Sequence, residues 1–99
     1  MGDTEPQIKL PPNELWGHIA KLAIADDKPI MLDYWADSLT KDVLIGVKKE
    51  VDEKLLVKNA EEYTSPISKI YKVSGCYIIC TENSIYLVSA DIPTKHINN

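Results

Sequence analysis

The chain has 99 residues, 44% of them hydrophobic, and its 15 acidic and 11 basic residues give a net charge of −4. This length suits one domain with its own core, and an acidic chain without a basic cluster repels phosphate backbones, so we expect no nucleic acid partner. No apolar run approaches the roughly 20 residues needed to cross a bilayer, and the acidic start lacks a signal-peptide pattern. We therefore expect a cytoplasmic protein without membrane contact.

The N-terminal part of the chain predicts an arm followed by one helix. Residues 1–12 contain three prolines and are expected to form a flexible N-terminal arm. Asn13 is a favourable N-cap residue, and the helix should end near Asp26. His18 and Lys21 fall on the polar arc of this helix, and the opposite arc is an apolar stripe at helical spacing. The stripe consists of Leu15, Trp16, Ile19, Ala20, Leu22 and Ala23.

The middle of the chain is rich in strand-forming residues. Residues 30–35 are apolar and aromatic and predict a strand, and residues 36–42 predict a polar loop. The alternation over 43–48 and the apolar run within 54–60 predict two further strands. We favour a hairpin over a helix for residues 47–63 because β-branched residues and a glycine precede the turn, although the charged residues there also suit a helix.

Residues 68–90 give the clearest pattern, a three-stranded antiparallel meander. Three β-rich runs are separated by the two-residue turns Ser74-Gly75 and Glu82-Asn83, which are typical of antiparallel hairpins. Such turns fix the register and assign each side chain to one face of the sheet. One face is almost wholly apolar and should pack against the helix; it carries Tyr71, Val73, Cys76, Ile78, Cys80, Ile85, Leu87 and Ser89.

The opposite face of the meander is mixed but holds several large apolar side chains, among them Tyr77, Ile79, Tyr86 and Val88. One helix cannot cover both faces. Either the sheet closes into a small barrel, or the N-terminal arm covers this face, or a partner does. The predicted fold class is thus α+β, with one helix packed on a mostly antiparallel, strongly curved sheet or small barrel of five to six strands. The domain should span residues 13–93 and be followed by a C-terminal tail, 94–99.

The two cysteines are interpreted as core residues. Cys76 and Cys80 lie four residues apart on one predicted strand, about 13 Å at ~3.3 Å per residue. A disulfide needs Cα atoms within about 7 Å, so the two residues cannot bridge each other. We expect both to be small buried thiols in a reducing compartment.

No motif commits the chain to a reaction, a metal or a cofactor, and we predict no catalytic, metal or cofactor site. The histidines, His18 and His96, are expected on the surface and not beside a nucleophile. The aspartates within residues 33–42 do not have the spacing of a calcium loop. Carboxylate chemistry at Glu61-Glu62 remains a third and weaker alternative.

The hypothesis we favour from the sequence is a non-enzymatic protein-interaction module that binds a partner protein or a second copy of itself. Aromatic anchors dominate interface energetics. The alternative is a small-ligand-binding domain with a pocket between helix and sheet, lined by Trp16 and the two aromatic residues at 34 and 35. No sequence feature separates the two hypotheses. The expected partner contact consists of Tyr77, Ile79, Tyr86 and Val88, extended by Tyr34 and Trp35.

Overall fold

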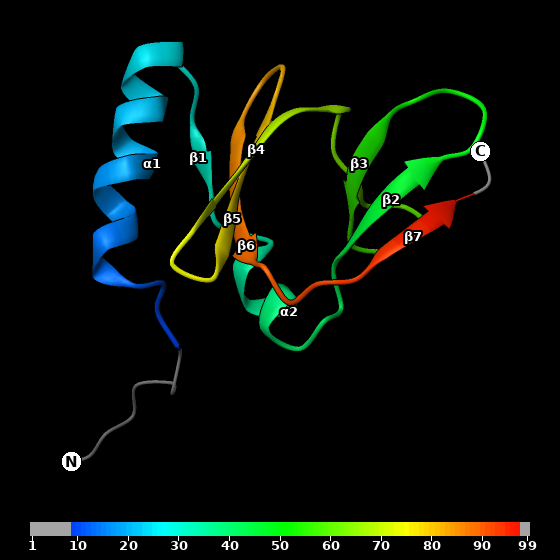
Figure 1. Ribbon diagram of the computed structural model, residues 1–99, viewed down its shortest axis with the longest axis horizontal. Helices are drawn as coiled ribbons and strands as arrows, with labels where there is room; N and C mark the ends of the chain where they lie inside the picture. Colours follow the sequence, from blue (N-terminus) through cyan, green and yellow to red (C-terminus); the bar gives the residue numbers. More distant parts are fainter. Residues whose placement is uncertain (1–8, 98–99) are drawn as a thin grey trace.

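The computed structural model of the protein describes residues 9–97. These residues form three layers: a helix, a four-stranded sheet and a three-stranded sheet (Figure 1). The elements in chain order are α1 (Asn13–Asp26), β1 (Ile30–Met31), α2 (Trp35–Leu39), β2 (Leu44–Lys48), β3 (Lys54–Val57), β4 (Ile67–Val73), β5 (Cys76–Thr81), β6 (Ile85–Ser89) and β7 (Thr94–Ile97).

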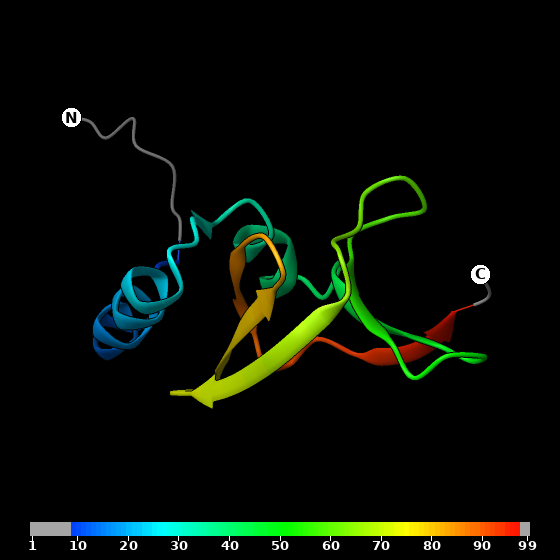
Figure 2. The same ribbon diagram turned by 90° about the horizontal axis from the view of Figure 1, so that it is seen from above.

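The strands form two separate sheets, and these do not close into a barrel (Figure 2). The first sheet has the order β1-β6-β5-β4, and the second has the order β3-β2-β7. β1 runs parallel to β6, and β7 runs parallel to β2, whereas the other neighbouring strands are antiparallel. The predicted α+β class and the packing of the N-terminal helix on a mostly antiparallel sheet are confirmed.

The meander of β4, β5 and β6 has the predicted register. Val73 pairs with Cys76 across the first turn, and Ile79 pairs with Tyr86 across the second hairpin. Ser74 and Gly75 both have positive φ angles, 52° and 76°, as a type I′ turn requires. The local sequence of the turns therefore sets which side chains share a face of the sheet.

The first core lies between α1 and the first sheet, as predicted. Leu15 and Ile19 of α1 are fully buried against it. The predicted helix stripe was too broad, because Trp16 is 36% exposed and Ala20 is exposed. Each residue turns about 100° around a helix axis, so Trp16 points a quarter-turn away from the sheet. The buried sheet residues of this core are Cys76, Ile78, Cys80, Ile85 and Leu87.

The second core lies between the two sheets and covers the other face of the meander. Ile79 and Val88 of the first sheet are fully buried there, against Ile45 and Leu56 of the second. Tyr77 and Tyr86 are half-buried and pack at the margin of the same cluster. The face that one helix could not cover is therefore covered by the chain's own β2–β3 hairpin, with Val43 and Ile92 beside it.

The predicted strand at residues 30–35 is mostly wrong, because only Ile30–Met31 form a strand. Trp35 instead begins α2. Tyr34 packs into the second core and Trp35 packs into the first. A chain that leaves the sheet edge here can send two successive aromatic side chains into two different cores, and this gain in burial outweighs their strand propensity.

The hairpin predicted for residues 47–63 is confirmed, since β2 pairs antiparallel with a shorter β3. The segment expected to be a C-terminal tail contains β7, which pairs with β2. The amide of Ile45 donates to the carbonyl of Pro93 at 2.9 Å, so the chain joins the sheet directly after the proline. Gly46 makes room for this strand, because a Cβ there would lie 3.0 Å from the Cδ1 atom of Ile97.

Most of the predicted N-terminal arm, residues 1–8, lies outside the described residues. The part that is described contacts the domain: Pro11 is buried, and the carbonyl of Lys9 accepts a hydrogen bond of 2.8 Å from the Trp35 indole. The helix begins at Asn13, with Pro12 in the N-cap position. Asn13 is therefore the first helical residue and not the cap.

Candidate functional site

The structure places most of the predicted partner contact inside the protein. Ile79 and Val88 have no exposed surface, and Tyr34 and Trp35 are 5% and 7% exposed. All of these except Trp35 lie between the two sheets. The predicted contact is therefore corrected: these four side chains are core residues, Trp35 in the first core and the other three beneath the second sheet, and they do not form a surface for a partner.

The groove between α1 and the first sheet does not have the predicted lining. It has a volume of about 210 Å³, below the roughly 300 Å³ at which small-molecule pockets begin. Trp35 instead lines a separate hollow of about 310 Å³ beside Lys9 and Pro12. The residues that line the groove are His18, Lys21, Leu22, Tyr71, Val73 and Ile78.

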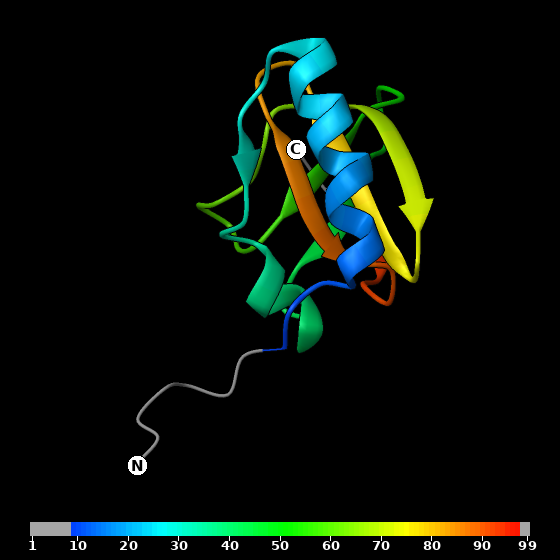
Figure 3. The same cartoon turned by 90° about the vertical axis from the view of Figure 1, so that its left-hand side faces the viewer.

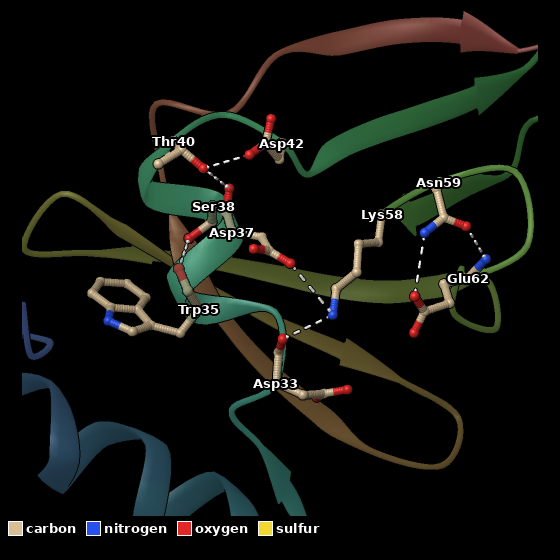
Figure 4. Close-up of polar contacts among 9 residues, drawn as sticks. All are labelled: Asp33, Trp35, Asp37, Ser38, Thr40, Asp42, Lys58, Asn59 and Glu62. Carbon is tan, nitrogen blue, oxygen red and sulfur yellow. Dashed lines mark hydrogen bonds and ion pairs between the residues drawn. The ribbon is translucent and has the colours of Figure 1, made fainter. Parts of the chain in front are cut away.

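A cation and two aromatic rings join the second sheet to the first. The rings of Tyr34 and Tyr86 meet edge to face, with centroids 5.4 Å apart. The Lys58 ammonium lies 4.7 Å from the centre of the Tyr34 ring. It also donates to the Asp33 carbonyl at 3.1 Å and lies 3.5 Å from a carboxylate oxygen of Asp37 (Figure 4). These contacts tie the end of β3 to the start of α2.

Burial raises the pKa of Tyr34 to about 12, and the nearby Tyr86 and Asp33 add to the rise. The folded protein thus holds this proton more tightly than the unfolded chain, so the free energy of unfolding should fall as pH rises from 10 toward 12. The expected loss is on the order of 2 kcal/mol. Denaturant unfolding across this pH window measures it, and Tyr34→Phe should flatten the dependence; an equal slope in that variant would contradict the assignment.

α2 is fixed to the first sheet by one buried hydroxyl group. The Ser38 hydroxyl donates to the Trp35 carbonyl at 2.6 Å and accepts from the Ser89 amide at 2.9 Å. Ser38 has no exposed surface. Ser89 is the last residue of β6, so this serine provides the acceptor that the strand end lacks.

Several polar groups of the described residues form hydrogen bonds within the fold, and both thiols are buried. Asp42 accepts a hydrogen bond of 2.7 Å from Thr40, and Asn59 donates to Glu62 at 3.2 Å (Figure 4). Across residues 9–97, no three His, Cys, Asp or Glu side chains gather as a metal-binding group. Cys76 and Cys80 are free and buried as predicted, and burial raises the pKa of both thiols, which keeps them protonated.

β4 is one of the most exposed elements of the described domain. It is the outermost strand of the first sheet, and its residues 68–72 are all exposed. Figure 3, which faces α1, shows β4 beyond the helix at the edge of the sheet. Ile70 and Tyr71 are each 37% exposed and lie on opposite faces of the strand. The strand therefore presents an unpaired edge and both of its faces.

Hollows lie on both sides of this strand. The groove beside α1 opens along Tyr71 and Val73. A second hollow, about 400 Å³ in volume, lies on the β3 side and is lined by Asp52, Lys54 and the first four residues of β4. A chain placed along β4 would thus have space for side chains on either face.

The hairpin geometry indicates which backbone groups of β4 face outward. In an antiparallel pair, hydrogen-bonded and non-hydrogen-bonded residue pairs alternate. Val73 closes a type I′ turn with Cys76, so Val73 and Tyr71 bond to β5. The N–H and C=O groups of Ile70 and Lys72 then point away from the sheet. The sequence analysis predicted this strand but did not predict a site at its edge. The sequence feature that could have indicated the site is the pair Lys69 and Lys72 in the first strand of the meander.

Comparisons of the chain with models of known protein families, with curated proteins and with solved structures give no match. Within residues 9–97, neither helix is long and apolar enough to cross a membrane. The arrangement of the described residues is thus the basis for the functional proposal.

Proposed function

We propose that the protein is a non-enzymatic interaction module that binds an extended segment of a partner protein along the free edge of β4. The observation that supports this is a seven-residue edge strand whose central five residues are exposed. In strand addition, main-chain hydrogen bonds provide affinity, and alternate side chains provide specificity. Seven residues span roughly 23 Å at ~3.3 Å each, which is enough for several such bonds.

Lysines at the edge favour a different protein over a second copy of this chain. Lys69 and Lys72 are both exposed on β4. Any antiparallel pairing of two β4 strands would gather four lysines around the new pair, and like charges at a strand edge oppose such pairing. The module is therefore proposed to be an adaptor, inhibitor or subunit that binds another protein through β4.

The test uses three blocked peptides as long as β4, in which valine alternates with glutamate, with glutamine or with lysine. At least one should slow hydrogen exchange at the Ile70 and Lys72 amides. Ile70→Pro should abolish this binding, because it removes an outward N–H that makes no bond within the sheet. Ile70→Thr keeps that N–H and should bind as the parent protein does.

Circular dichroism and thermal unfolding would establish that both Ile70 variants are folded. An Ile24→Ser variant controls for contacts elsewhere, because Ile24 lies on the outward face of α1 and is 82% exposed. If no peptide slows exchange in β4, or if Ile70→Pro binds as well as Ile70→Thr, strand addition at this edge is wrong.

A further inference from the structure

We infer that the β4 edge selects an extended segment that carries acidic side chains alternating with apolar ones; this rests on the strand-addition function proposed above. The first observation is the local charge. Lys69 and Lys72 lie on β4, and Lys21 lies across the groove on α1 together with His18. The chain as a whole has a net charge of −4, so this basic edge opposes the overall sign.

These lysines have no internal partners among the described residues. The salt bridges formed within residues 9–97 are Lys48–Glu53 and Lys58–Asp37. Lys21, Lys69 and Lys72 therefore have ammonium groups available to an incoming carboxylate. A single exposed ion pair contributes little binding free energy, but a strand that aligns several such pairs gains their sum.

The register places one lysine on each face of β4. Lys69 pairs with Cys80, whose side chain belongs to the core beneath α1, so Lys69 is on the α1 side. Lys72 pairs with Tyr77, which packs toward the second core, so Lys72 is on the other side. A partner strand that lies along β4 thus meets a lysine whichever face its acidic side chains occupy.

The apolar part of the recognition comes from the groove between α1 and β4. Leu22, Val73, Ile78 and Tyr71 supply most of its apolar lining. The groove opens beside the outward edge, and its volume of about 210 Å³ accommodates an aliphatic side chain. Side chains that alternate along a strand would place an apolar residue in this groove and acidic residues on the opposite face, within reach of Lys72.

Two acidic residues of the domain, Glu14 and Asp52, lie near this strand. Glu14 accepts a hydrogen bond of 2.6 Å from the Ser74 hydroxyl at the β4–β5 turn. Asp52 lines the far end of the hollow on the β3 side, next to Lys54. The central residues of β4 themselves include Lys69 and Lys72, so carboxylates of the partner should lie opposite these residues.

A peptide fits this edge better than a nucleic acid does. Outward N–H and C=O groups at Ile70 and Lys72 match those of another peptide backbone. Phosphate backbones require many basic contacts for binding at physiological salt, whereas this edge offers Lys21, Lys69 and Lys72 in a chain of negative net charge.

The same three peptides test the inference by isothermal titration calorimetry at low and at physiological salt. The glutamate–valine peptide should bind about tenfold or more tighter than the glutamine–valine peptide, and the lysine–valine peptide should bind most weakly. The preference should shrink as salt rises. The double variant Lys69→Gln, Lys72→Gln should remove most of the preference for the glutamate peptide, because it leaves Lys21 as the one remaining lysine of this group. Lys49→Gln, Lys95→Gln is the matched control, because it changes net charge equally at exposed lysines elsewhere.

The outcomes separate the two proposals. If the glutamine and glutamate peptides bind equally and both protect β4, the acidic preference is wrong and strand addition stands. If no peptide protects β4, both proposals fail. If a single-stranded oligonucleotide displaces the glutamate peptide and itself binds more tightly, the partner class is wrong. A preference that is undiminished in the Lys69→Gln, Lys72→Gln protein would also overturn the assignment of these lysines.

Discussion

Replacement of Ile79 by alanine is expected to lower the free energy of unfolding by about 2–5 kcal/mol, the range for truncation of a fully buried aliphatic side chain. Ile79 has no exposed surface and packs against Ile45 and Leu56 of the second sheet. The substitution removes these contacts and leaves a cavity between the sheets. Denaturant unfolding monitored by tryptophan fluorescence would measure the loss.

Ile70 offers a matched control for this prediction. It is the cross-strand partner of Ile79 and lies on the same face of the sheet. Ile70 is 37% exposed because it belongs to the edge strand, so Ile70→Ala should cost no more than about 1 kcal/mol. Equal losses for the two variants would mean that the second sheet does not cover the meander.

The second large effect is expected for Ser38→Ala, which should destabilise the protein by about 1–3 kcal/mol. The substitution removes the acceptor of the Ser89 amide, a contact of 2.9 Å at a fully buried site. A buried donor without a partner costs its full desolvation penalty. The Ser89 amide should also exchange its hydrogen faster, which locates the effect at the end of β6.

Ser68→Ala is the control for the loss of a serine hydroxyl. Ser68 donates to the Cys80 carbonyl at 3.0 Å, but it is exposed on the edge strand. Water can replace that bond, so the change in the free energy of unfolding should stay within about 0.5 kcal/mol. A Ser38→Ala variant as stable as Ser68→Ala would show that Ser38 does not hold α2 on the sheet.

At the candidate site, local sequence patterns predicted the face on which a side chain lies but not its burial. The meander and its register followed from two turns, so the sequence placed Ile70 and Ile79 on one face. It could not show that one of them is buried and the other exposed. That difference arises because the second sheet covers this face of β5 and β6 but leaves residues 68–72 of β4 exposed, which depends on contacts between segments far apart in the chain.

The aromatic pair shows the same limit. Tyr34 and Trp35 have the composition of a strand, and their spacing gives no sign of a helix. In the structure they enter two different cores, and α2 starts at Trp35. Their burial decides the local conformation, because the apolar area that two aromatic rings remove from water exceeds the difference in strand propensity.

The sequence by itself determined the elements whose causes are local: α1 from its apolar spacing, the β2–β3 hairpin, and the meander from its turn residues. Only the tertiary structure decided that β7 joins β2, that the second face of the meander becomes a core, and that the middle of β4 stays exposed at one edge of the first sheet. Periodicity shows which side of an element is apolar but not what covers it. What covers a face depends on how distant segments of the chain pack. In this protein they bury the aromatic face of the meander, so the candidate contact is the edge of β4 instead.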